Sequence, residues 1–468
     1  MQEPKCQGCR ERDVRIAGLE DRVGELEATV RDLVSRLDQN SSNSSVPPSA
    51  NPPQAPKPVV KTPTGRKPGG QPGHQACVRP RLPRERVQHV IDYIPKTCDH
   101  CDAPLPAEAG KNDPEPVWHQ VAELPEVLVE VTEHLAHGRT CPGCAKVTWE
   151  SIPEPIREHA FGARLVALLS YLSGNPHVSK RGIQEIVETV LGVPMALGTV
   201  ANLEQEMSAA LAPAHAEAQA AVQAAPVKNV DETGWKQAGK TCWMWAAATT
   251  IVACFVIHSS RGAAGLAALL GRLKGVVCSD RWAVYGRRAA GLRQLCWAHL
   301  KRDFQKLVDR GGDAQETGKA GLAAVAIVFE LWHAFRGGGL SRRQLRQEMA
   351  CWRADLHDQL KQGCACKDSK AATFCENLLA VEPALWTFVD KPNVEPTNNH
   401  IERLLRSGVL WRKNAFGCHS VAGCRFVERI LTVVQTLRLQ KRPVLEFLRT
   451  TLTAHRHGEA APKLAMVG

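Results

Sequence analysis

The stretch VKNVDETGW, residues 227–235, contains a short apolar, strand-like run that leads into an acid, Asp231. The stretch VVCSDR, residues 276–281, leads into Asp280 in the same way. A third acid, Glu402, lies in NNHIER, residues 398–403, near the start of a helical stretch rich in arginine. Two divalent metal ions that clamp a phosphoryl transfer need shared carboxylate ligands. Aspartates after two strands and a glutamate on a helix could supply them.

Each of these acids also has a plain structural interpretation. Asp231 could be a turn residue or a helix N-cap, and Asp280 could cap a helix that follows it. Glu402 could pair with a neighbouring arginine on a solvated helix. The order Asp–Asp–Glu in strand, strand and helix contexts favours a joint catalytic role, but spacing alone leaves both interpretations open.

The segment around the first two acids alternates between strand-like and helical patterns. We expect strands at residues 227–231, 243–248, 251–257, 275–280 and 292–296, and a helix at residues 262–273. The uncharged stretch Thr241–Ile257 is marginal for a membrane span, so a buried β-hairpin is favoured. A mixed sheet with these two aspartates matches a ribonuclease-H-like arrangement. Residues 314–389 then turn helical, with glycine breaks at 337–339 and 363, which predicts a helical insertion before Glu402.

The composition is that of a basic protein with more than one domain. A length of 468 residues exceeds the usual size of one domain, and a hydrophobic fraction of 44% is enough to build cores. The net charge of +11 favours a polyanionic partner such as nucleic acid, although many basic proteins bind none. The polar N-terminus shows no secretory signal, and 17 cysteines fit reduced thiols and a metal site. We therefore expect a cytoplasmic protein.

Residues 16–37 carry apolar side chains in alternating steps of three and four, which is typical of a coiled-coil seam. The a positions hold Ile16, Val23, Val30 and Leu37, and the d positions hold Leu19, Leu26 and Leu33. β-Branched residues at a with leucine at d favour a parallel two-stranded coil. The alternative is an amphipathic helix packed on its own domain.

The segment after this seam is rich in Ser, Asn and Pro, which predicts a disordered linker. Between Pro52 and Arg86 there are eight Lys or Arg residues, among them Arg66 and Lys67, and one acid. Such an arm could lie in a minor groove or along phosphates. It could equally be a solvated linker.

Two CxxC pairs are each built to present two thiolates to one tetrahedral zinc ion. We therefore expect a structural Zn²⁺ bound by Cys98, Cys101, Cys141 and Cys144. A third pair, Cys6 and Cys9, has no second pair nearby.

Helical patterns at residues 160–172, at 180–191 and from 197 onward precede the predicted sheet. The second and third are separated by a break at Gly192–Pro194, which is the outline of a helix-turn-helix. Thr199, Asn202 and Gln205 would then face outward. The same outline is common in helical bundles that bind no DNA.

The C-terminal stretch, residues 401–450, holds ten Lys or Arg residues and three acids, interleaved with apolar positions. This pattern suits a helical region with one face on the core and the other on phosphates, and a solvated basic face is the alternative. The leading candidates for DNA contact are Arg403, Arg406, Arg412 and Lys413.

Several motifs together resemble those of DDE transposases of the insertion-sequence-66 type, specifically their transposase C subunit. They are DETGW at 231–235, CSDxxAxY at 278–285, CWAHxKRxF at 296–304, and NNxxER at 398–403 with RKN at 412–414. The coil, the linker, GGQPGH at 69–74 and the CxxC pairs resemble the family in the same order. The chain departs from the family pattern at Arg281-Trp282, at Ile401 and at 417–420, and none of these departures removes an acid.

The resemblance implies a transposase that binds the terminal inverted repeats of an insertion sequence, then cuts and joins DNA. Asp231, Asp280 and Glu402 would hold Mg²⁺ or Mn²⁺ as the catalytic triad. The partners would be transposon ends and target DNA, companion proteins of the same element, and no membrane, with the protein associated with the nucleoid. Cys296 and His299 lie near the expected sheet, where they could order the site, contact DNA or belong to the core.

The expected architecture is a multidomain α+β protein whose ribonuclease-H-like mixed α/β core carries a helical insertion. The segments are a coiled coil (1–39), a disordered basic linker (40–75), a zinc-binding module (76–152), a helical segment (153–225), the first part of the core (226–313), the insertion (314–392), the C-terminal core helices (393–455) and a tail (456–468). We expect a homodimer or higher oligomer through the coil. Two rival functions are a transposase-derived DNA-binding regulator without catalysis and a ribonuclease-H-like nuclease without strand transfer.

Overall fold

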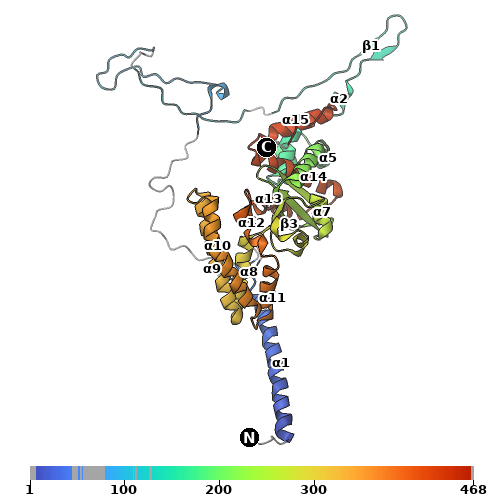
Figure 1. The fold of residues 1–468 in the computed structure, drawn as a ribbon. Coiled ribbons are helices and arrows are strands. Elements are labelled where there is room, and N and C mark those ends of the chain that lie inside the picture. The colour runs from blue at the N-terminus through green and yellow to red at the C-terminus, as the bar shows by residue number, and fades with distance from the viewer. Residues whose placement is uncertain are drawn as a thin grey trace. The chain divides into compact units, whose positions relative to one another are not determined.

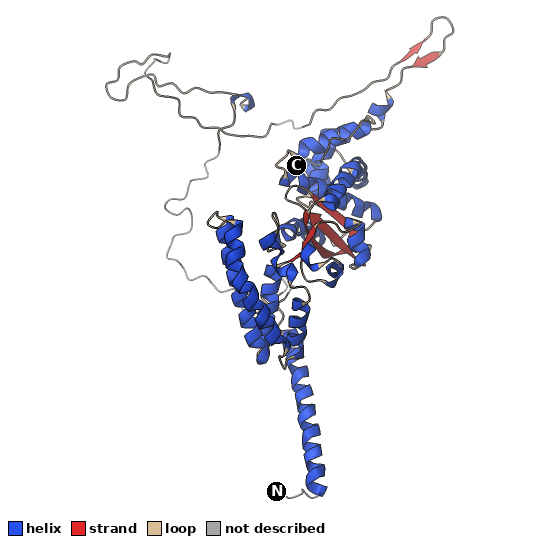
Figure 2. Ribbon diagram, viewed as in Figure 1, coloured by secondary structure: helices blue, strands red, loops and turns tan. Residues whose placement is uncertain are grey.

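The computed structural model describes residues 7–44, 51, 52, 55, 80–108, 110, 113–125 and 129–464. The chain divides into two compact units, Met1–Ala55 with Glu133–Gly468, and Pro56–Thr132. In the larger unit helices surround one small sheet (Figures 1 and 2). The described residues therefore form a mixed α and β protein, as expected. Arg66, Lys67 and Cys6 lie outside the described residues.

The sheet of the larger unit has five strands in the order β5-β4-β3-β6-β7. Its strands are β3 (Val227–Gln237), β4 (Lys240–Ala248), β5 (Ala253–His258), β6 (Val276–Ser279) and β7 (Arg293–Leu295). β3, β4 and β5 pair antiparallel, whereas β3, β6 and β7 pair in parallel. All five predicted strands are present, and the uncharged stretch Thr241–Ile257 forms the buried hairpin β4–β5.

β3 extends further than the sequence pattern predicts. We expected it to end at Asp231, but it runs on to Gln237, and Asp231 pairs with Ala246 in the middle of the β3–β4 ladder. The ladder continues to a tight turn at Ala238 and Gly239, both with positive φ, which suits a two-residue hairpin. The interpretation of Asp231 as a turn residue or N-cap is therefore wrong.

The edge strand β5 is covered by α14 (Val421–Leu439), whose side chains take its outward N–H groups. Ala253 N donates to Thr436 Oγ1 at 3.1 Å, and Phe255 N donates to Thr432 Oγ1 at 3.0 Å. Ile257 N donates to a carboxylate oxygen of the buried Glu428 at 2.6 Å. Acceptors four residues apart on a helix match donors two residues apart on a strand. The helix thus satisfies an edge that would otherwise pair with another chain.

Thr432→Val should lower the free energy of unfolding by about 1–3 kcal/mol, because it leaves the buried Phe255 N–H without an acceptor while nearly preserving volume. Chemical denaturation measures the change. The control, Thr450→Val, alters an exposed threonine of α15 (Val444–Arg456) and should change little. Equal stability of the two variants would contradict this role of Thr432.

Short helices precede the sheet: α2 (Glu154–Arg157), α3 (Ala163–Gly174), α4 (Lys180–Thr189), α5 (Leu197–Ala210) and α6 (Ala212–Ala224). α3, α4 and α5 bury a small apolar cluster that includes Ile183, Val187 and Val200. Buried Glu204 of α5 pairs with Lys180 at the start of α4 and accepts from Ser173. Asn202 and Gln205 are exposed on α5, as predicted, whereas Thr199 is half-buried.

Between β7 and the C-terminal helices lie α8 (Trp297–Arg310), α9 (Asp313–Arg336), α10 (Arg342–Cys364), α11 (Ser369–Leu379) and α12 (Pro383–Asp390). They share a second apolar core. The predicted glycine breaks follow the end of α9 and fall in the last turn of α10. By length and composition α9 could cross a membrane, and here it packs between α8 and α10. α7 (Ala263–Leu270) covers the β4–β5 hairpin, and α13 (Asn399–Ala415) lies against β3.

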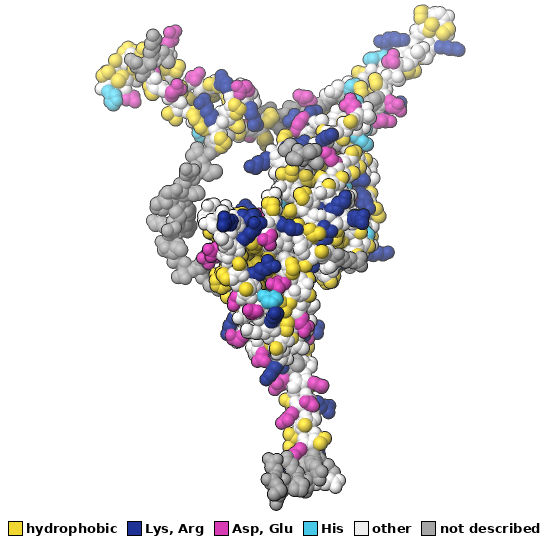
Figure 3. Space-filling view, in the orientation of Figure 1, with side chains coloured by type: hydrophobic (Ala, Val, Ile, Leu, Met, Phe, Trp, Pro, Cys, Tyr) yellow, Lys and Arg dark blue, Asp and Glu magenta, His cyan; other side chains and the backbone are white. Residues whose placement is uncertain are grey.

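The N-terminal helix α1 (Gln7–Leu37) projects from the α8–α11 region (Figure 1). Its seam side chains are 45–70% exposed, and Figure 3 shows hydrophobic groups uncovered along this helix. Asp32 of α1 pairs with Lys370, and Asn43, just after the helix, donates to Asp309 at 2.9 Å. These two contacts tie the C-terminal end of α1 to the core.

The described part of the smaller unit contains no α-helix and no β-strand. A 3-10 turn, η2, spans Arg84–Arg86. Gln120 bonds to the backbone N and O of Leu82, at 2.8 and 3.1 Å. In the larger unit a hairpin of β1 (Gly138–Thr140) and β2 (Val147–Trp149) flanks the second CxxC pair.

Candidate active site

Asp231 and Asp280 occupy equivalent positions along two neighbouring strands of the sheet: Asp231 lies in β3, and Asp280 directly follows β6. Asn229 of β3 pairs with Cys278 of β6 in the parallel ladder, so each aspartate comes two residues after a member of this pair. This register brings the acids to the same edge, where the charge of Asp280 helps to raise the pKa of Asp231. Two strand contexts far apart in sequence thus supply neighbouring carboxylates.

Glu402 lies in the first turn of α13, and Asn398 fastens the start of that helix to β3. The fully buried Asn398 donates from Nδ2 to Val230 O at 2.9 Å and accepts from Asn229 Nδ2 at 3.0 Å. Its backbone N–H donates to Cys296 Sγ at 3.2 Å. The helix that carries the third acid is therefore fixed to the residues immediately before Asp231.

Burial is the main cause that raises the pKa of all three acids. For Asp231 the pKa rises well above its usual value, and the charges of Glu232, Asp280 and Glu402 contribute after burial. Oε1 of Glu402 is buried without a hydrogen-bond partner. Crowded, buried carboxylates with an orphaned oxygen suit a divalent cation, because its charge would offset their mutual repulsion.

Glu232, the acid next to Asp231, already has a cationic partner in the protein. Its buried carboxylate pairs with Arg261 Nε at 3.0 Å and accepts from the hydroxyl of Tyr285 at 2.7 Å. The guanidinium of Arg261 lies between the rings of Trp243 and Trp282, 4.6 and 4.4 Å from their centroids. Glu232 is thus engaged within the protein, whereas among the described residues the carboxylate of Asp231 accepts one hydrogen bond, from the N–H of Glu232 at 3.0 Å.

His299 and Cys296, at the start of α8, lie close to Glu402. Nδ1 of His299 lies 3.5 Å from Oε1 of Glu402, and burial, with the nearby Arg302 and Arg281, lowers the pKa of His299 to about 4. One ligand atom from each of Cys296, His299 and Glu402 falls within 4.8 Å of the others. Burial raises the pKa of Cys296 to about 11, so this core residue stays a thiol.

A family model described as Transposase IS66 family matches residues 158–425, which include all three acids. The chain belongs to this family. The family is one of transposases. A second model, a family of unknown function (DUF6444), matches residues 1–80.

An uncharacterized protein of Sinorhizobium fredii, y4qI, is 26% identical to this IS66-family chain over 260 residues. The match covers 48% of this chain and 46% of that protein, so the chain spans about half the length of this relative.

The basic candidates of α13 differ in what they contact in this IS66-family chain. Arg403 and Arg406 are exposed, one turn apart. Nη1 of Arg412 donates to Gly234 O and to Thr233 Oγ1, the latter at 3.3 Å. Arg412 therefore braces β3 next to the acids, while Arg403 and Arg406 face solvent.

The CxxC pairs at 98–101 and 141–144 each form a tight turn. Asp102 N donates to Cys98 O, and Ala145 N donates to Cys141 O, both at 2.9 Å, with φ 56° at Asp102 and Ala145. Backbone N–H groups lower the pKa of Cys98 and of Cys141, as suits thiolate ligands. The pairs belong to different compact units, so one zinc site made by all four cysteines stays a prediction.

Three residues of the site had no assigned role in the sequence pattern, Arg261, Tyr285 and Asn398, and His299 had several alternative roles. Tyr285, Asn398 and His299 lie inside motifs that the sequence singled out, so position within a motif was the available signal. Arg261 follows β5 in a loop with no motif, and only the fold brings it to Glu232.

Proposed function

We propose that this chain binds the terminal inverted repeats of an insertion sequence and catalyses metal-dependent cleavage and strand transfer of DNA. Asp231, Asp280 and Glu402 would hold two divalent metal ions. The observation that carries the proposal is the convergence of three partly buried acids from β3, the end of β6 and α13 in a transposase-family chain. The mixed sheet, with its order β5-β4-β3-β6-β7, supports a ribonuclease-H-like core.

The position of each acid sets the role that it would have in metal binding. Mg²⁺ or Mn²⁺ held there would lower the pKa of the attacking water or 3′-hydroxyl and offset charge on the leaving oxygen. Both other acids raise the pKa of Asp231, so Asp231 is the natural shared ligand. Asn398 keeps Glu402 in reach of it, and the pairing of Glu232 with Arg261 keeps a fourth carboxylate from competing.

Strand transfer in vitro tests the proposal directly. Purified full-length protein is mixed with pre-cut element ends, supercoiled target DNA and Mg²⁺. We expect joined product. Protein that binds the ends but neither nicks nor joins them would favour a DNA-binding regulator, and nicking without joining would favour a ribonuclease-H-like nuclease.

DNA binding should depend on exposed cations near the acids. Arg403→Ala with Arg406→Ala should weaken binding to element ends and reduce the slope of log K against log salt by roughly 2, since each phosphate contact contributes about 0.9. Fluorescence anisotropy at several salt concentrations measures both. The control pair, Arg353→Ala with Lys361→Ala, removes two exposed cations of α10. An equal loss in both pairs would point to net charge rather than to local contact.

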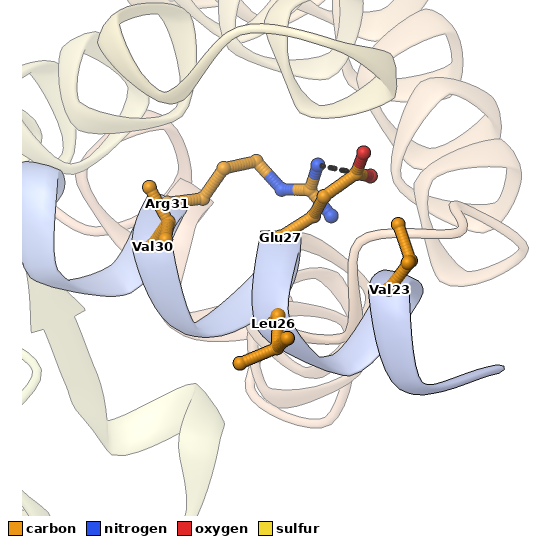
Figure 4. Close-up of a pocket in the computed structure, with 5 residues that line it drawn as sticks. All are labelled: Val23, Leu26, Glu27, Val30 and Arg31. Carbon is orange, nitrogen blue, oxygen red and sulfur yellow. Dashed lines mark ion pairs between the residues drawn. The ribbon is translucent and has the colours of Figure 1, made fainter. Parts of the chain in front are cut away.

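α1 is proposed to form a parallel coiled coil with a second copy, with its seam as the interface. Val23, Leu26 and Val30 line a shallow groove on α1, beside which Arg31 and Glu27 form an ion pair of 3.8 Å (Figure 4). The groove is apolar and uncovered, so a partner helix would bury it.

Leu26→Asp should convert dimer to monomer at micromolar concentration, because it places a charge in the seam. Sedimentation velocity of the full-length protein measures the change. Val14→Asp, at an f position on the opposite side of the helix, is the control and should leave the dimer intact. If the wild type is a monomer, or if the dimer survives Leu26→Asp, then α1 does not form the proposed dimer interface.

The remaining expectations complete this proposal. The turns of the two CxxC pairs support a structural Zn²⁺ held by Cys98, Cys101, Cys141 and Cys144. α4 and α5, with exposed Asn202 and Gln205, suit a helix-turn-helix on the terminal repeats. The protein would act on the nucleoid in the cytoplasm, with companion proteins of the same element.

A further inference from the structure

We propose that His299 supplies a nitrogen ligand at the metal position served by Glu402, and that this position therefore prefers Mn²⁺ to Mg²⁺. The inference rests on the proposed function, since it extends the three-acid site. It assigns to the start of α8 a role in choosing the metal.

The start of α8 is fixed between the two segments that carry Asp280 and Glu402. Cys296 N donates to Ser279 O, the residue before Asp280, at 2.9 Å. Trp297 N donates to Pro396 O, just before α13, at 2.8 Å. These bonds fix the backbone of this first turn, which carries His299. The fold thus holds the imidazole at the acid.

The two facing atoms have no partner that would explain their burial. Within the described residues, Nδ1 of His299 and Oε1 of Glu402 are both buried without a hydrogen bond, although they lie only 3.5 Å apart. Unsatisfied buried polar atoms are costly. Two cis ligand atoms at about 2.1 Å from one octahedral ion are about 3.0 Å apart. The two atoms lie 3.5 Å apart, so a small approach of the side chains would let both bind one ion.

Cys296 completes the surroundings but is not a ligand in this proposal. Its sulfur accepts the N–H of Asn398 at 3.2 Å and is buried in the core. The ligand set is then imidazole with carboxylates. Mg²⁺ prefers oxygen ligands alone, whereas transition metals accept imidazole readily. A nitrogen at one of two positions should make that position favour Mn²⁺.

Mn²⁺ binding to the full-length protein without DNA tests the assignment apart from activity. Pulsed electron paramagnetic resonance should show ¹⁴N coupling to Mn²⁺ in the wild type and none in His299→Ala. Titration should show Mn²⁺ affinity at this position reduced by about 10–100-fold in His299→Ala, with Mg²⁺ affinity changed by less than about threefold. The Mn²⁺-to-Mg²⁺ ratio of strand-transfer rates should fall. His333→Ala, an exposed histidine of α9, is the matched control.

Wild-type protein without ¹⁴N coupling, or unchanged Mn²⁺ affinity in His299→Ala, would overturn the proposal. If His299→Ala does not fold, wild-type protein labelled with ¹⁵N-histidine gives the same answer, because the ¹⁴N signal must then be replaced by ¹⁵N. Glu402→Gln separates this proposal from the proposed function. Loss of Mn²⁺ binding in Glu402→Gln but not in His299→Ala refutes only the histidine, whereas retention in Glu402→Gln refutes the three-acid site.

Discussion

Asp231→Asn is expected to reduce strand transfer by at least about 10³-fold, because a shared carboxylate is replaced by a neutral group of the same shape. The metal-free variant should be at least as stable as the wild type, since burial and three neighbouring acids already disfavour the charge of Asp231. Mg²⁺ should raise the melting temperature of the wild type and have little effect on the variant. Strand-transfer rates and thermal melting with and without Mg²⁺ measure both effects.

Glu395→Gln is the matched control for the third acid. Glu395 precedes α13 and pairs with Arg336 at the surface, 2.5 Å away, so it should be dispensable. Asp280→Asn and Glu402→Gln should behave as Asp231→Asn does. Full activity in Glu402→Gln together with its loss in Glu395→Gln would mean that Glu395 is the third ligand. Full activity in all three variants, Asp231→Asn, Asp280→Asn and Glu402→Gln, would contradict the proposed mechanism.

Asn398→Ala should have the second largest effect, on both stability and rate. It removes the side-chain amide that joins Val230 and Asn229 to the start of α13 and leaves buried polar atoms unpaired. We expect a loss of about 2–4 kcal/mol in the free energy of unfolding. Where the variant is folded, we expect a fall of about 10²-fold in the rate of strand transfer, because Glu402 loses its fixed position.

The neighbouring Asn399 provides a control with the same chemistry. It is exposed, at the first position of α13. Asn399→Ala should change stability by less than about 1 kcal/mol and leave most of the activity. If Asn398→Ala lowers stability but keeps the wild-type rate at a temperature where it is folded, Asn398 supports only the fold and does not position Glu402.

Local pattern was enough to determine much of this protein. Apolar runs predicted each strand of the five-stranded sheet, and the period of the helices predicted α1, the helices before the sheet and the insertion of α9 to α12. These elements follow from side-chain spacing, which acts over a few residues. The motifs around Asp231, Asp280 and Glu402 likewise indicated transposase ancestry, and the family match confirms that relationship.

Tertiary structure alone decided how these pieces meet. β3 runs past Asp231 to Gln237 because β4 and its turn extend the ladder, and the β3–β6 register sets Asp231 beside Asp280. Three further contacts join residues that are tens to hundreds of positions apart. Asn398 bonds to β3, Arg261 lies between two tryptophans, and His299 lies close to Glu402. The periods of helices and strands carry no information about such pairings, because they depend on which buried polar groups find partners after the chain has packed.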